Sequence, residues 1–141
     1  MKKTIAVLFM LIFLVLGCAK EKVKPSADSL MTQNVLGVLE SIKHAYEKKD
    51  GIVIEKRLAP ALSKDILDGF TFETAELTFN PRMVKINADS DVTVKLIWRG
   101  TWVVGGESLK GRGIGTLTFN GKTLELMKIE GNDPFRTPKV E

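Results

Sequence analysis

The stretch DSLMTQNVLGVLESIKHAYEKKDG, residues 28–51, decides the fold of this chain. Asp28 or Ser29 suits the N-cap of a helix, and the sequence KKDG at 48–51 places cations and then glycine at its end. Between them the apolar residues recur at helical spacing: Val35, Val38, Leu39, Ile42, Ala45 and Tyr46. The stretch therefore predicts one long helix with a single apolar face, which requires a second layer to cover it.

The rest of the chain predicts that second layer. Short helices are expected at 52–58, ended by Pro60, and at 63–67, capped by Ser63. The period then changes to two, which predicts strands at 75–79 with 84–86, 92–104, 109–119 and 124–129. Gly100 is expected to bend or bulge its strand, and Asn120-Gly121 to form a two-residue hairpin. The fold class is therefore α+β, a long N-terminal helix plus short helices packed on a curved antiparallel sheet.

Three features resemble the nuclear transport factor 2-like superfamily, a cone-shaped fold also called cystatin-like. They are the helix end AYEKKD at 45–50, the short helices around Leu58 and 63–67, and the long strands. The resemblance covers residues 28–135 and implies a cone enclosing a cavity. Members include enzymes, carriers and assembly factors, so the fold does not choose a function. Enzymatic members place Asp, His or Tyr in the cone; here His44 and Tyr46 are the only His and Tyr, point in different directions and complete no such set.

The N-terminus has the composition of an export signal. Lys2 and Lys3 precede an uncharged apolar run at 5–16, too short to cross a bilayer, followed by Gly17-Cys18. The sequence VLGC at 15–18 resembles the bacterial lipobox, which implies cleavage after Gly17 and acylation of Cys18, as with palmitate. The alternative is a cysteine that lies there by chance. Cys18 has no second cysteine to pair with, which favours the lipid.

These assignments give a domain plan and a location. We expect a signal peptide at 1–17, a lipidated tether at 18–27, the α+β domain at 28–135 and a C-terminal tail at 136–141. The mature chain has 19 Lys and Arg against 17 Asp and Glu, a net charge of +2, and no basic stripe for nucleic acid. The expected location is the bacterial cell envelope, with the lipid on Cys18 in the membrane. Ala19, where some lipoproteins have Asp, resembles a signal for the periplasmic face of the outer membrane in a Gram-negative cell.

Three aromatic residues are candidates for lining a pocket in the cone: Tyr46, Trp98 and Trp102. The tryptophans are four residues apart on one strand, so they share a face unless a bulge at Gly100 separates them. Core packing is the alternative role for all three.

Two further groups lie on the predicted strands. One is a cationic cluster on the outer face, a candidate anion or partner site whose alternative is an ordinary solvated surface: Lys95, Arg99, Lys110 and Arg112. The other is glycine at 111, 113 and 115, which leaves one strand face bare and allows curvature or close approach of the first helix.

The sequence thus favours a non-catalytic binding domain, with no metal or cofactor expected. Its expected partner is a small apolar ligand in the cone or an envelope protein, and the sheet is a candidate homodimer interface. The alternative is a small isomerase or hydrolase that uses the cone as its active site.

Overall fold

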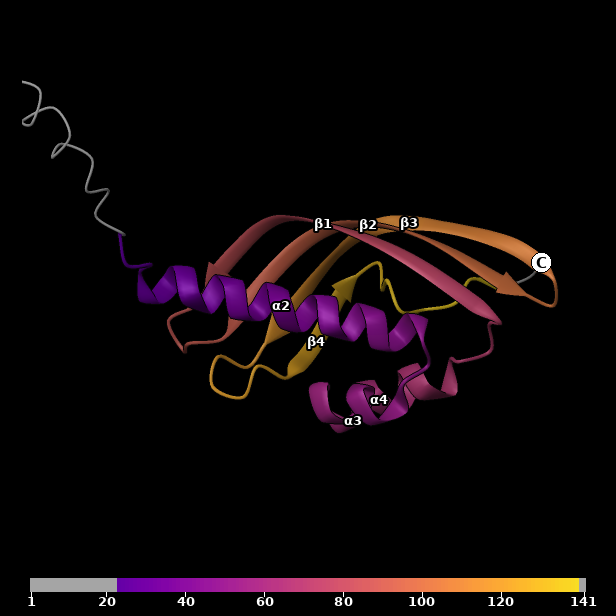
Figure 1. Cartoon of the computed structure of the whole chain (residues 1–141), viewed down its shortest axis with the longest axis horizontal. Coiled ribbons are helices and arrows are strands. Elements are labelled where there is room, and N and C mark those ends of the chain that lie inside the picture. The colour runs from indigo at the N-terminus through magenta and orange to yellow at the C-terminus, as the bar shows by residue number, and fades with distance from the viewer. Residues whose placement is uncertain (1–22, 140–141) are drawn as a thin grey trace, which may run out of the picture.

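A computed structural model describes residues 23–139 as three helices and one antiparallel sheet, in the order β1-β2-β3-β4. Figure 1 shows the sheet arching over α2, with α3 and α4 on the same side as α2. The elements are α2 (Ala27–Glu47), α3 (Gly51–Arg57), α4 (Pro60–Asp68), β1 (Thr74–Ile86), β2 (Val92–Val104), β3 (Glu107–Phe119) and β4 (Leu126–Gly131). The α+β prediction is confirmed. Cys18 and the expected signal peptide lie outside the described residues.

The long helix α2 buries the face that the sequence predicted, since the same six apolar residues are its buried ones. Its N-cap is Ser26, whose Oγ accepts a hydrogen bond from Ser29 N at 3.1 Å. The prediction of Asp28 or Ser29 as the cap was wrong because apolar periodicity locates the buried face, whereas the cap lies well before Val35, the first buried residue of that face. None of the described helices is long and apolar enough to cross a membrane.

The boundary between the two short helices lies just before Pro60. Pro60 begins α4, where its fixed φ suits the first turn and its missing N–H is not needed. Ser63 therefore lies inside α4, not at its cap; it is buried and donates its hydroxyl to Pro60 O at 3.0 Å. Asp50 caps α3 by accepting a hydrogen bond from Val53 N at 3.2 Å.

The strands differ from the prediction in two features, the position of the bulge and the length of the β3–β4 connection. The bulge lies in β1, between Pro81 and Met83, while β2 pairs in regular register through Gly100. The β3–β4 connection spans residues 120–125, since Asn120 N donates to Glu125 O at 2.9 Å. Asn120 Oδ1 also accepts hydrogen bonds from Lys122 N and Thr123 N, which shapes a wider turn than a two-residue hairpin.

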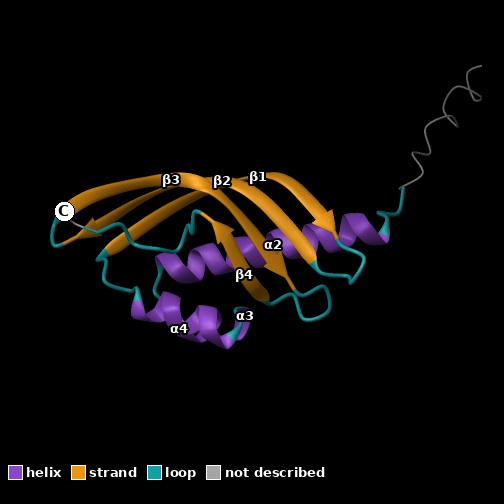
Figure 2. Cartoon of the chain, turned by 180° about the vertical axis from the view of Figure 1, so that it is seen from behind, coloured by secondary structure: helices purple, strands orange, loops and turns teal. Residues whose placement is uncertain are grey.

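The core occupies the concave side of the sheet, facing α2 (Figure 2). Alternate β2 residues point into it, from Val92 to Trp102, and the intervening residues face outward. After β4 the chain runs back across the concave side towards the β2–β3 hairpin (Figure 2). That return places the C-terminal segment, residues 132–139, at the open end of the cone.

Candidate functional site

The interior of the cone is filled by aromatic side chains. Trp98 and Trp102 lie on one face of β2 with their rings edge to face, 6.2 Å between centroids. Trp102 and Tyr46 have no exposed surface, and Trp98 is 6% exposed. These three side chains therefore fill much of the interior.

Glycines on β2 and β3 make room for the indoles. A Cβ at Gly100 would lie 2.3 Å from Trp102 Cη2, and one at Gly111 would lie 3.0 Å from Trp102 Cζ3. Alanine at Gly100 would therefore overlap the ring. Tryptophan thus covers Gly111 on the bare strand face. None of the nearest atoms to Gly111, Gly113 or Gly115 belongs to the first helix, so close approach of that helix, one of the two expected roles of these glycines, is wrong. The other expected role was curvature, and the sheet is curved (Figure 1).

A chain of hydrogen bonds ties the interior to the C-terminal segment. Trp102 Nε1 donates to Tyr46 Oη at 2.9 Å, and Tyr46 Oη lies 3.4 Å from Thr137 Oγ1. Thr137 in turn donates its single hydroxyl proton to Gly69 O at 3.0 Å, which leaves Tyr46 as the donor to Thr137. The chain joins β2, α2, the C-terminal segment and the end of α4, and it satisfies each buried polar group along it.

Phe135 closes the same end of the cone. Its ring is 2% exposed and lies 5.3 Å from Tyr46 and 5.8 Å from Phe79, centroid to centroid. Thr137, within the predicted tail at 136–141, is hydrogen-bonded to both Tyr46 and Gly69. The C-terminal segment therefore covers this end of the cone.

Asn132 holds that segment against β3. Trp98 Nε1 donates to Asn132 O at 2.9 Å, and Asn132 N donates to Ile114 O at 3.0 Å. A Cβ at Gly113 would lie 2.4 Å from Asn132 Cβ, and one at Gly115 would lie 2.9 Å from Asn132 O. These two glycines therefore allow the segment to cross the strand.

Two open cavities border the C-terminal segment, one on each side of it. The mouth cavity, about 780 Å³, lies between that segment and α4, with Asp65, Asp68, Thr71 and Arg136 among its lining residues. The sheet-side cavity, about 530 Å³, lies between the segment and β3, with Trp98, Lys110 and Arg112 among its lining residues. Of the three aromatic residues expected to line a pocket, Trp98 does so. Tyr46 and Trp102 do not line either cavity, because α2, β2 and the C-terminal segment bury them completely.

Asp133 lines both cavities, and its surroundings shift its pKa. Burial raises the pKa of its carboxyl, which the hydrogen bond from Phe135 N at 2.8 Å and the nearby Arg136 only partly counteract. Sequence reasoning missed this residue. Its local signal, Gly-Asn-Asp-Pro at 131–134, is an ordinary loop pattern, and burial comes from the long-range return of the chain.

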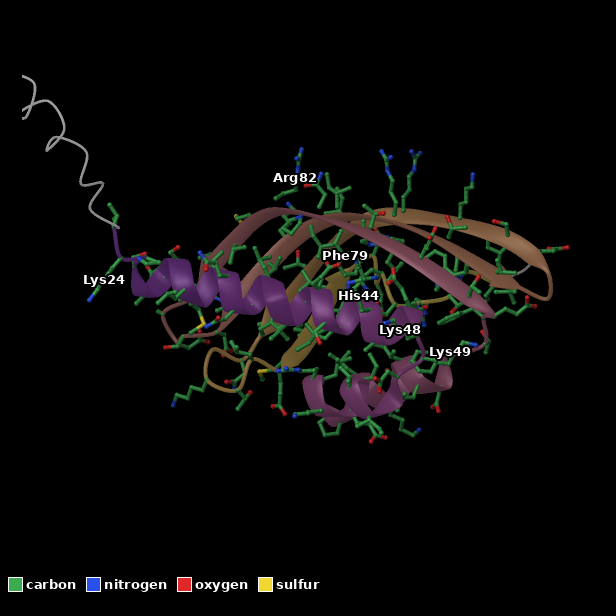
Figure 3. The ribbon with its side chains drawn as sticks, viewed as in Figure 1. Lys24, His44, Lys48, Lys49, Phe79 and Arg82 are labelled. Carbon is green, nitrogen blue, oxygen red and sulfur yellow. The ribbon has the colours of Figure 1, made fainter. Side chains whose placement is uncertain are left out.

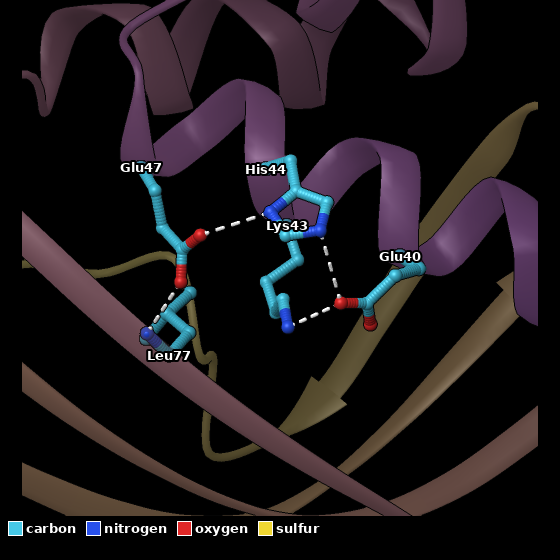
Figure 4. Close-up of polar contacts among 5 residues, drawn as sticks. All are labelled: Glu40, Lys43, His44, Glu47 and Leu77. Atoms are coloured by element: carbon cyan, nitrogen blue, oxygen red, sulfur yellow. Dashed lines mark hydrogen bonds and ion pairs between the residues drawn. The ribbon is translucent and has the colours of Figure 1, made fainter.

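His44 lies away from these cavities, on an exposed side of α2 (Figure 3). Its ring nitrogens contact two carboxylates, Glu47 at 3.2 Å and Glu40 at 3.3 Å, and its side chain is 57% exposed. Glu47 also accepts a hydrogen bond from Leu77 N at 2.7 Å, while Lys43 pairs with Glu40 (Figure 4). Glu47 thereby links this cluster on α2 to the edge strand β1. Within residues 23–139 no group of His, Cys, Asp and Glu is arranged to hold a metal ion.

Comparisons with known proteins support the fold alone. A solved structure described as a nuclear transport factor 2 (NTF2-like) superfamily protein from Salmonella enterica serovar Typhimurium aligns with a TM-score of 0.64. It is 14% identical, and the alignment covers 79% of this chain and 96% of that one. No family model matches the sequence, and no curated protein matches it. The chain thus has a nuclear transport factor 2-like fold, as the resemblance implied.

Proposed function

We propose that this protein is a lipoprotein of the bacterial cell envelope, anchored through Cys18, whose cone-shaped domain binds a partner without catalysing a reaction. The observation that carries the binding role is the filled cone. Trp98, Trp102 and Phe135 occupy the interior, and the hydrogen bonds from Trp102 to Gly69 close it. A small apolar ligand would have to displace Phe135 to enter. An envelope protein that binds across the C-terminal segment needs no such displacement.

The anchoring is tested in cells with the full chain. We expect wild type to incorporate labelled palmitate and fractionate with membranes, and Cys18→Ser to lose both the label and the processing step. Ala19→Asp is a matched variant beside the same site: it should keep the label, and in a Gram-negative host it should move the protein from the outer to the inner membrane. Normal processing and membrane retention of Cys18→Ser would refute the anchoring.

The binding role is tested with a photo-crosslinking amino acid placed at position 136, which lines both cavities, or at position 52 as a control. Ile52 is 81% exposed on α3 and lies outside both cavities. We expect a discrete adduct with an envelope protein from position 136 and none from position 52. Equal adducts at both positions, or none at position 136, would contradict a binding role for this end of the cone.

One observation favours the enzymatic alternative. Asp133 is a largely buried carboxyl of raised pKa that lines a cavity next to Trp98, an arrangement suited to a general acid or base. An isomerase or hydrolase would use the sheet-side cavity for its substrate. Turnover of a candidate substrate that Asp133→Asn abolishes, while the fold is unchanged, would establish this alternative over the binding role.

A further inference from the structure

The convex face of the sheet carries a cluster of cations without acidic partners. Lys95 and Arg99 on β2, and Lys110 and Arg112 on β3, are all exposed there, and the strand register places Arg99 directly opposite Arg112. Like charges directly opposite one another destabilise a sheet. The ion pairs found within residues 23–139 involve other side chains. An anionic partner would offset the repulsion that this arrangement retains.

The bulge in β1 adds a fifth cation. Arg82 lies at the register shift between Pro81 and Met83, and Figure 3 shows it projecting from the convex side of the sheet. These five residues are called the convex patch: Arg82, Lys95, Arg99, Lys110 and Arg112. Two acidic residues lie on the same face: Glu76 is opposite Thr101, and Glu130 pairs with Lys128 at 2.9 Å. The five cations of the patch therefore outnumber the acidic residues on this face.

Apolar side chains lie within the patch. Ile97 is paired with Ile114 across the two central strands, and they are 36% and 51% exposed. Met83 lies opposite Lys95 and is 48% exposed. A shallow hollow of about 470 Å³, lined by Arg99, Thr101, Lys110 and Arg112 with two glycines, adjoins them. Exposed apolar residues surrounded by long cationic side chains match a bilayer interface, where headgroup phosphates meet acyl chains.

We propose that the convex patch docks the domain on an anionic phospholipid surface. This proposal rests on the proposed anchoring at Cys18, which would keep the domain close to a membrane. Residues 19–26 between Cys18 and α2 hold the domain within about 30 Å of an attached lipid, so the membrane is the most concentrated anionic surface it meets. Docking by the convex face leaves the helices and the mouth cavity, on the concave side, facing away from the membrane.

A second copy of the chain fits this surface poorly. A two-fold interface places the same patch on both partners, so Arg99, Arg112 and Lys110 of one copy would face the same cations of the other. That arrangement would add to the repulsion already present within each sheet. The patch therefore argues against the homodimer through the sheet that the sequence suggested.

The test uses the mature chain, residues 18–141, carrying Cys18→Ser, which contains every described element and no lipid. Sedimentation with vesicles of phosphatidylcholine containing phosphatidylglycerol measures binding, and vesicles of phosphatidylcholine alone are the neutral arm. Each Lys or Arg near an anionic surface strengthens binding roughly fivefold, so Arg99→Gln with Arg112→Gln should weaken binding roughly 25-fold. Raising the salt concentration should weaken wild-type binding as well.

The matched control is Lys56→Gln with Lys64→Gln, which removes the same charge from exposed positions on α3 and α4. This lysine double variant should keep most of the binding. The arginine double variant should unfold at no lower temperature than wild type, because it lacks the like-charge contact between Arg99 and Arg112. Several results would overturn the proposal: no binding to anionic vesicles, equal binding to neutral vesicles, or equal losses of binding in the arginine and lysine double variants. A dimer in analytical ultracentrifugation that buries the patch would overturn it in favour of a second copy. None of these outcomes depends on whether Cys18 is acylated in cells, so the two proposals fail separately.

Discussion

Replacing Phe135 with alanine tests whether the cone is filled, because this ring closes it. Phe135 is 2% exposed and packs edge to face on Tyr46 and Phe79. Truncating a buried phenylalanine costs about 3–5 kcal/mol, the sum of lost transfer free energy and the space left behind. We expect about 3 kcal/mol here, the lower end, because the ring also borders the mouth cavity and water can enter the space.

The assay is urea unfolding followed by the fluorescence of Trp98 and Trp102, which lie in the same core. With a urea m-value of about 1.5 kcal/mol/M, a loss of 3 kcal/mol lowers the unfolding midpoint by about 2 M. Phe135→Leu keeps most of the volume and should cost less than about 1.5 kcal/mol. Ile114→Ala, a truncation on the exposed convex face, should cost less than about 1 kcal/mol.

A cost below about 1 kcal/mol for Phe135→Ala, no larger than that of Ile114→Ala, would refute the reasoning. It would mean that the C-terminal segment contributes little to the folded state. The cone would then be open in solution, and a small apolar ligand would become the better candidate partner.

Two further substitutions test the polar interior. Tyr46→Phe removes the acceptor of Trp102 Nε1 and the donor to Thr137, so it should lower the free energy of unfolding by about 1–3 kcal/mol; a neutral result in urea unfolding would show that water replaces the hydroxyl. Asp133 has a raised pKa, so the native state binds more protons than the unfolded state between the ordinary and the raised pKa, and this group's contribution to stability falls as pH rises through that window. Asp133→Asn keeps the acceptor for Phe135 N and should be at least as stable at pH 7 with a flatter stability profile in acid; an unchanged profile in thermal unfolding against pH would contradict the burial of this carboxyl.

Local patterns predicted the elements of this fold well and their ends less well. Helix α2 and its buried face follow from spacing alone, and β2 follows from strict alternation. Pro60 was placed at the end of one helix and begins the next, since a proline is compatible with both positions. A bend or bulge was expected at Gly100, whereas the bulge lies between Pro81 and Met83, because a glycine in a strand signals either an irregularity or a close neighbour. Here the neighbour is Trp102.

The sequence by itself determined the α+β class, the two tryptophans on one face of β2, and the prediction of a lipid at Cys18. These depend on short spacings, which the helix and strand periods translate directly into faces. Only the tertiary structure decided that the cone is filled, since Tyr46 meets Thr137 across 91 positions of the chain. It also decided that Arg99 lies opposite Arg112 and that the Asp133 carboxyl is partly buried. Strand register and the path of a returning segment are set by packing between distant parts of the chain, and no local pattern specifies them.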